Sequence, residues 1–495
     1  MSDIKTDDIQ LEHALGTTRP SEAAASDAGD SSSFHGPYRL SIRTYMVLTA
    51  MAFAWGTCTM ANIGPSTTYS YAGSLADRFG KKWFILSGGV AGVIGNVVAG
   101  SARSTEVIIA GQALNGLGSS LYLLVIPSSM EIVLASHRNF AQGFMGSVNG
   151  LVSIMILLVF GAFAKSSSSG WRWVYYFNAI FFGVVAVFLF VFYNPPPTKL
   201  RRENTTKRYG RTDGLLDHRF FHERNYPLVL SVAFVDGMLL YGVNAFLPQQ
   251  VAGLFTHDPI MVSVYLLPLN LCVIGGIMSS AYVLGVLKHY RILLISSLVL
   301  IAIFCGLLAL VNADRAAMLL VFTGLIGLGV GVTTALPNVV MTYAVPPHLI
   351  GTAGTLLASC RGLGGTIGIT IFATINGNYM SSHRISDVTN AVVNAGLPTS
   401  SAQEFVAAFL AGNSSALATI PGATPSVFTA AEHSLEHVTT ESFKFVWIAN
   451  VIIAVVTCVL TCFLQSVAHH MTGHVEAPLE QGKLRESAMV RETKH

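Results

Sequence analysis

The chain has 495 residues, of which 52% are hydrophobic and 11% are charged, and its mean hydropathy is +0.56. Soluble domains carry about 25% charged residues, so this composition excludes an ordinary water-soluble protein and favours one that crosses a membrane many times. The formal net charge of +3 is too small to indicate a nucleic-acid partner.

The chain begins with a polar, acid-rich segment at residues 1–43, which we expect to be a disordered tail. It lacks the apolar stretch of a cleavable signal peptide, so targeting is expected from the first apolar run. All six cysteines lie in or beside apolar runs, and we therefore expect no disulfide framework.

Eleven apolar runs are long enough to cross a bilayer as helices. They predict an all-α polytopic membrane protein with an N-terminal transmembrane bundle at residues 44–194 and a C-terminal bundle at residues 226–467. The predicted spans are residues 45–64, 83–101, 106–128, 142–164, 173–193, 226–250, 260–287, 292–311, 316–340, 351–376 and 443–467.

The loops predict the orientation of the chain. Residues 195–225 follow directly after Asn194 and carry eight Lys or Arg against four acids, which is typical of a cytosolic linker. Residues 377–442 contain a single basic residue, Arg384, and are expected to form an extracytosolic loop with a glycosylation site at Asn413. The basic tail at residues 468–495 is expected in the cytosol.

The first span does not fit this orientation. Residues 65–76 are polar and too few to cross the bilayer, yet they separate two runs that should both begin on the cytosolic side. We therefore expect the N-terminal bundle to lack one helix.

The loop Gly73–Lys82, "GSLADRFGKK", resembles the signature between the second and third helices of the major facilitator superfamily. The stretches Gly170–Phe181, Asn225–Gln250 and Gly351–Phe372 resemble its fungal fourteen-helix drug:proton antiporters, within the trichothecene-efflux and siderophore-transporter group. Against that family, the second helix and an extra pair between the bundles are missing. The resemblance implies alternating access, and it implies a conformational latch formed by Gly73, Asp77, Arg78, Gly80, Lys81 and Lys82. The alternative is that this loop only anchors the topology.

Two charged residues stand out within predicted spans. Asp236 and Arg361 are each the eleventh residue of a span, and both spans run in the same direction, so they should lie at the same depth near the bilayer midplane. We expect them to pair. Proton uptake by Asp236 would then loosen a packed state, and the alternative is a static structural pair.

Polar side chains elsewhere in the spans are candidates for a substrate cavity, because such a cavity needs a few hydrogen-bonding groups among apolar walls. Hydrogen bonding between helices is the alternative use of each. The candidates are Gln112, Asn115, Asn149, Asn178, Tyr241, Asn244 and Asn270.

An enzyme is not expected. Three His pairs with four-residue spacing fall in different loops, on opposite sides of the membrane, so they do not predict a shared metal site. The sequence has no HExxH motif and no P-loop, and we expect no metal or cofactor.

The sequence therefore predicts a secondary transporter for proton-coupled efflux of small organic toxins, drugs or secondary metabolites. The alternatives are a siderophore-iron transporter, or a truncated paralogue or product of lost exons that does not transport. The expected partners are a small-molecule substrate, protons and the lipid bilayer. We expect a monomer in the plasma membrane, with a vacuolar or other internal membrane as the alternative.

Overall fold

The computed structural model describes residues 81–133, 137–167, 169–194, 225–256, 258–287, 289–312, 315–345, 350–410, 417 and 420–464. All regular structure within these ranges is helical. Ten segments in them are long and apolar enough to cross a membrane, and each overlaps one of the eleven predicted spans. The first predicted span, at residues 45–64, lies outside the described residues.

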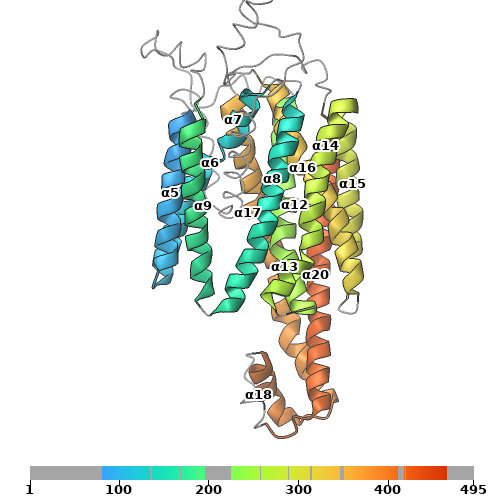
Figure 1. Ribbon diagram of the computed structural model, residues 1–495. Coiled ribbons are helices and arrows are strands. Elements are labelled where there is room, and N and C mark those ends of the chain that lie inside the picture. Colours follow the sequence, from blue (N-terminus) through green and yellow to red (C-terminus); the bar gives the residue numbers. More distant parts are fainter. Residues whose placement is uncertain are drawn as a thin grey trace, which may run out of the picture.

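The helices form two groups along the chain (Figure 1). The N-terminal group comprises α5 (Lys81–Ser101), α6 (Thr105–Tyr122), α7 (Val125–Glu131), α8 (Arg138–Ser166) and α9 (Gly170–Phe192). The C-terminal group comprises α12 (Asn225–Leu254), α13 (Pro259–Tyr265), α14 (Leu267–Leu287), α15 (Tyr290–Leu308), α16 (Ala316–Ala344), α17 (Ile350–Asn394), α18 (Thr399–Leu410) and α20 (Pro425–Thr461).

Two membrane spans are interrupted by a short turn. The break between α6 and α7 lies just before Pro127, and the break between α13 and α14 lies just before Pro268. Proline lacks the backbone N–H that would bond to the carbonyl four residues earlier, so a turn at these positions is expected. Both broken spans contribute residues to the central cavity described below.

Glycines allow the helices to approach closely. A Cβ on Gly95 would overlap the backbone of Asn115, which joins α5 to α6. A Cβ on Gly331 would overlap the Val273 carbonyl oxygen, which joins α16 to α14. In a bilayer the helices gain little from apolar contact alone, so this close backbone packing holds the bundle together.

Helix α8 connects the two groups. Gly143, Gly146 and Gly150 pack against Ala281, Ile277 and Ile274 of α14. At the first end of α8, Arg138 Nη1 donates to the Thr342 carbonyl of α16 at 3.2 Å. At its other end, Lys165 Nζ lies 2.5 Å from Asp258 Oδ2, just before α13. The N-terminal group therefore contacts the C-terminal group along the full length of α8.

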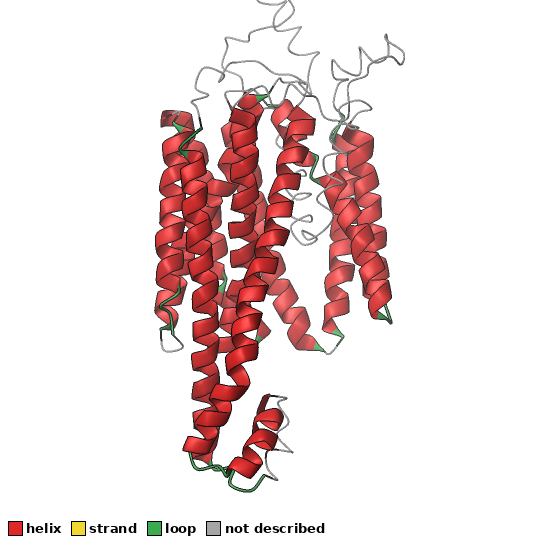
Figure 2. Ribbon diagram, turned by 180° about the vertical axis from the view of Figure 1, so that it is seen from behind, coloured by secondary structure: helices red, strands yellow, loops and turns green. Residues whose placement is uncertain are grey.

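Residues 377–442, expected as a loop, are mostly helical. Helix α17 continues to Asn394, α18 follows, and α20 begins at Pro425. These segments form a lobe that projects past the other helices, at the end where α8 finishes and α13 begins (Figures 1 and 2).

The lobe has an apolar core of its own, which is why it folds as helices. Val388 and Val392 of α17 pack with Phe405 of α18 and Val427 of α20, all fully buried. Two residues after the end of α17, Gly396 has a φ of 104°, which is easily reached only by glycine. There, Leu397 N donates to Val392 O at 3.1 Å and Gly396 N to Val393 O at 3.0 Å, the pattern of a Schellman cap.

Candidate functional site: a central cavity beside a buried ion pair

Helices α12 and α17 pack backbone to backbone at the site. A Cβ on Gly237 would overlap the Arg361 carbonyl oxygen, and a Cβ on Gly364 would overlap that of Phe234. This contact brings the side chains of Asp236 and Arg361 to the same level of the membrane.

Asp236 and Arg361, which were predicted to lie at equal depth, are side by side in the structure. Arg361 Nε lies 3.1 Å from Asp236 Oδ2, and their side chains are 10% and 1% exposed. Thr333 of α16 also contacts the carboxyl group. A lone charge at this depth would be costly, so each group stabilises the other in its charged form.

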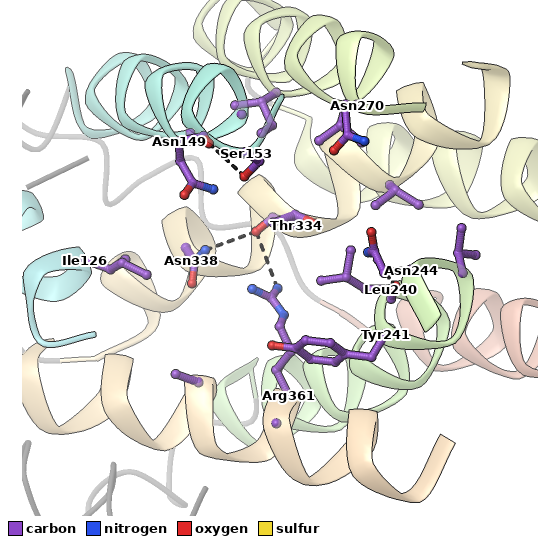
Figure 3. A pocket seen from close by; sticks show the side chains of 18 of the residues that line it. Ile126, Asn149, Ser153, Leu240, Tyr241, Asn244, Asn270, Thr334, Asn338 and Arg361 are labelled. Atoms are coloured by element: carbon purple, nitrogen blue, oxygen red, sulfur yellow. Dashed lines mark hydrogen bonds between the residues drawn. The ribbon is translucent and has the colours of Figure 1, made fainter. Parts of the chain in front are cut away.

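Arg361 also reaches the wall of a cavity. Its Nη2 donates to the Thr334 carbonyl of α16 at 3.4 Å, and Asn338 Nδ2 donates to the same oxygen at 3.0 Å (Figure 3). Asp236 is not among the residues that line the cavity. The arginine therefore lies between the carboxylate and the cavity.

The cavity has a volume of about 150 Å³ and lies where the two helix groups meet. The N-terminal group lines it from α7 and α8, and the C-terminal group lines it from α12, α14, α16 and α17. Among the predicted cavity residues, Asn149, Tyr241, Asn244 and Asn270 line it.

Three further polar side chains, which were not predicted from the sequence, also line the cavity. Ser153 lies one turn after Asn149 on α8, and Thr334 and Asn338 lie one turn apart on α16. The four-residue spacing in both helices was a usable signal, because residues at that spacing share a helix face.

Three amides of the cavity, Asn244, Asn270 and Asn338, each make a bond within their own helix. Asn244 Nδ2 donates to Leu240 O at 2.8 Å, and Asn270 Nδ2 donates to Leu266 O at 3.0 Å. An amide group has two N–H donors and one carbonyl acceptor, so each of these side chains retains hydrogen-bonding capacity for a ligand.

The other predicted cavity residues lie elsewhere. Gln112, Asn115 and Asn178 do not line the cavity, and they hydrogen-bond between α5, α6 and α9. Asn96 Nδ2 donates to Asn115 Oδ1 at 2.8 Å, Asn178 Nδ2 donates to Asn96 Oδ1 at 3.1 Å, and Gln112 Nε2 donates to Tyr175 at 2.9 Å. These bonds satisfy the side-chain amides. For Gln112, Asn115 and Asn178 the structure therefore agrees with the alternative use, hydrogen bonding between helices.

The predicted latch is only partly within the described residues. Lys81 is buried at the start of α5, and the Lys82 ammonium lies 5.3 Å from the centre of the Phe190 ring of α9. Gly73, Asp77, Arg78 and Gly80 lie outside the described residues, as does the glycosylation candidate Asn413.

One buried amide on α8 has no hydrogen-bond partner in the described part of the chain. Gln142 is 1% exposed, and neither its oxygen nor its nitrogen is bonded. Its position, seven residues before Asn149, places it on the same helix face, toward the Arg138 end of α8. The described residues contain no group of three His, Cys, Asp or Glu side chains that could hold a metal ion.

Comparisons with known proteins agree with this architecture. The family model described as Major Facilitator Superfamily matches residues 29–369. The efflux pump FUS6 of Gibberella fujikuroi is 23% identical over 394 residues, covering 67% of this chain and 70% of the pump. The MFS-type efflux pump LUC4 of a Fusarium species is 23% identical over 471 residues, covering 82% and 80%.

A bacterial relative and a solved structure extend the comparison. Multidrug resistance protein 3 of Bacillus subtilis is 23% identical over 382 residues, covering 67% of this chain and 73% of that protein. The solved structure of the proton:xylose symporter XylE superposes with a TM-score of 0.58 at 10% identity, covering 88% of this chain and 97% of XylE. At that identity the likeness concerns the fold alone.

Proposed function

Because this chain belongs to the Major Facilitator Superfamily, a family of integral membrane transporters and not of enzymes, we propose that it exports small organic molecules by proton-coupled alternating access. The observation that carries the proposal is the central cavity. Its walls come from both helix groups, so a rocking motion of one group against the other would expose it to each side in turn.

The proposed site of proton binding is Asp236. Arg361 of α17 is the charged side chain that faces it, Thr333 of α16 is a polar one, and α13 and α20 place no described charged group against it. A proton would remove the charge that holds Arg361. Helices α12 and α17 would then pack against each other in a different arrangement. Because Arg361 also lines the cavity, proton binding would be coupled to a change in the cavity.

Export is supported by the printed names of the relatives, which are efflux pumps and a multidrug resistance protein. Import of an iron-loaded siderophore is the second candidate. The stretches Gly170–Phe181, Asn225–Gln250 and Gly351–Phe372 resemble siderophore transporters as well as toxin-efflux pumps. A product that does not transport is the third. For a transporting protein we propose the plasma membrane, with a vacuolar or other internal membrane as the alternative.

The test uses the full chain, purified and reconstituted in liposomes that enclose a pH-sensitive dye. A panel of neutral, acidic and basic amphipathic compounds is added under an imposed pH gradient. We expect at least one compound to change the rate of proton movement in these liposomes, and to have no such effect in protein-free liposomes or with Asp236→Asn. If radiolabelled members of the panel crossed no faster than in protein-free liposomes, the transport proposal would be wrong.

A further inference from the structure

We propose that the central cavity binds an organic anion, with the carboxylate of the substrate held by Arg361. This inference rests on the proposed transport function and names the substrate class of the same cavity. Neither the family nor the named relatives specify a charge for what is carried here, whereas the lining of the cavity does.

The first observation is the charge of the lining. Among the described residues that line the cavity, Arg361 is the one charged side chain, and the others are amides, hydroxyls and apolar groups. Its counter-charge, Asp236, is 1% exposed and lies behind it. A molecule in the cavity therefore meets a cation and no anion.

The second observation is the hydrogen bonding of the guanidinium. Arginine has five N–H donors in a planar fork. Nε faces Asp236, Nη2 makes a long bond of 3.4 Å to Thr334 O, and Nη1 has no partner among the described residues. Figure 3 shows the guanidinium directed toward Thr334, between Asn338 and Tyr241. Such a fork binds a carboxylate through two parallel hydrogen bonds.

A third observation points to the same place. The Thr334 hydroxyl is buried at the cavity wall and has no hydrogen-bond partner in the described part of the chain. A buried polar atom without a partner is uncommon, because it has lost its water without gaining a replacement bond. A carboxylate on Arg361 would give this hydroxyl an acceptor.

The volume and the apolar lining of the cavity indicate the size and character of the part of the substrate that lies beyond its carboxylate. Its volume of about 150 Å³ is below the 300 Å³ or so of a typical drug site, so this conformation admits a small acid or one part of a larger molecule. Leu240, Val273 and Val330 supply an apolar wall for the remainder. The predicted substrate is a small amphipathic carboxylic acid.

The test measures binding of two matched probes to the full chain in lipid nanodiscs. 1-Naphthoate and 1-naphthamide share a ring and nearly a size, and differ in charge at neutral pH. We expect naphthoate to bind at least tenfold more tightly. Arg361→Gln should remove this preference, and Arg361→Lys should retain part of it because the charge remains. Arg315→Gln, the same change at an exposed residue before α16, should leave the preference intact.

Arg361→Gln leaves Asp236 without its partner and can unfold the protein. The double variant Asp236→Asn/Arg361→Gln removes both charges and keeps the test valid. The proposal is overturned if the two probes bind equally, if neither binds at millimolar concentration, or if the preference survives in the folded double variant. Transport of neutral compounds with no preference for naphthoate would overturn this inference and leave the transport function standing. Selective naphthoate binding without any transport would do the reverse.

Discussion

Arg361 connects Asp236 to the cavity: its Nε lies 3.1 Å from the carboxylate, and its Nη2 reaches the Thr334 carbonyl at the cavity wall. One guanidinium therefore faces two possible anionic partners, the built-in carboxylate and a bound substrate. A change in the charge of either partner therefore alters how strongly Arg361 interacts with the other. The first two predictions rest on this coupling.

The first prediction concerns whether proton binding to Asp236 strengthens or weakens anion binding to Arg361. A proton on Asp236 releases Arg361 for a substrate anion, and an anion on Arg361 favours a neutral Asp236. Proton and anion should therefore assist each other, by the same factor in both directions. Naphthoate affinity should rise as the pH falls from about 8 to about 5, by at most about tenfold per pH unit. Asp236→Asn should bind tightly with no such dependence.

A fall in naphthoate affinity on acidification would contradict this sign. If the sign holds, an anion and a proton cross the membrane in the same direction. Export of the anion would then carry a proton out with it, driven by the concentration gradient of the substrate.

The second prediction is the energetic coupling within the pair. Removing one member of a buried ion pair typically costs about 3–5 kcal/mol, whereas removing both costs much less. Arg361→Gln should be the more harmful single change, because it leaves a carboxylate that is 1% exposed, while Asp236→Asn leaves a guanidinium that touches the cavity. Thermal unfolding of the two single variants and the double variant completes a double-mutant cycle. Additive effects would show that the pair contributes no coupling.

The third prediction tests the contact between α12 and α17. Gly237→Ala would place a methyl group on the Arg361 carbonyl oxygen and force the helices apart, so we expect a loss of about 1–3 kcal/mol in unfolding free energy. Gly377→Ala is the matched control, because a Cβ there meets nothing within 4 Å and alanine favours a helix. Equal unfolding temperatures for the two variants would contradict the close contact.

The fourth prediction concerns the unpartnered amide of Gln142. Gln142→Leu should stabilise the fold by about 1 kcal/mol, because it removes a buried polar group without a hydrogen bond. Gln250→Leu should do the opposite. That amide is equally buried, but its oxygen accepts a bond from Trp447 Nε1 at 2.9 Å. If Gln142→Leu lowered stability as Gln250→Leu does, Gln142 would have a partner in the folded protein.

The fifth prediction concerns the ion pair between Lys165 and Asp258, which joins α8 to α13. The hydrogen bond from Lys165, followed by one from the Ile260 N–H, holds the pKa of Asp258 below its usual value. A lowered folded pKa means that the stabilisation is present above the ordinary aspartate range and is lost as the pH falls through the lowered value.

Lys165→Gln should therefore move this loss to higher pH. Hydrogen exchange of residues 258–266, compared with the parent protein at one mildly acidic pH, should show faster exchange in the variant. Lys444→Gln is the control, since Lys444 pairs with Glu441 on α20 and does not contact α13. Unchanged exchange in Lys165→Gln would show that the pair does not stabilise the start of α13.

Much of the fold followed from the sequence because a bilayer imposes simple lengths. Ten of the spans were found by apolar length alone, and equal depth in two parallel spans was enough to pair Asp236 with Arg361. The lobe was missed because its helices are amphipathic and polar overall. The spacing of Val388 and Val392, and the glycine at position 396, were the available signals.

The cavity was only partly predictable. Asn115 and Asn149 are both amides within apolar runs, yet Asn115 bonds to Asn96 between packed helices, and Asn149 faces the cavity. Apolar runs do not reveal which side of a membrane helix meets a neighbour and which meets a void, since both sides are hydrophobic. That distinction required the packing of the whole bundle.

Helix α17 carries Arg361 and then runs without a break into the lobe. Its 45 residues extend about 68 Å at 1.5 Å each, more than twice the 30 Å or so of the hydrocarbon core. The charged side chain beside the central cavity therefore lies on the same helix that continues into the lobe. A fluorophore attached to the lobe would report the tilt of α17, and an antibody fragment bound there would hold this helix in one position. Neither reagent would have to enter the bilayer.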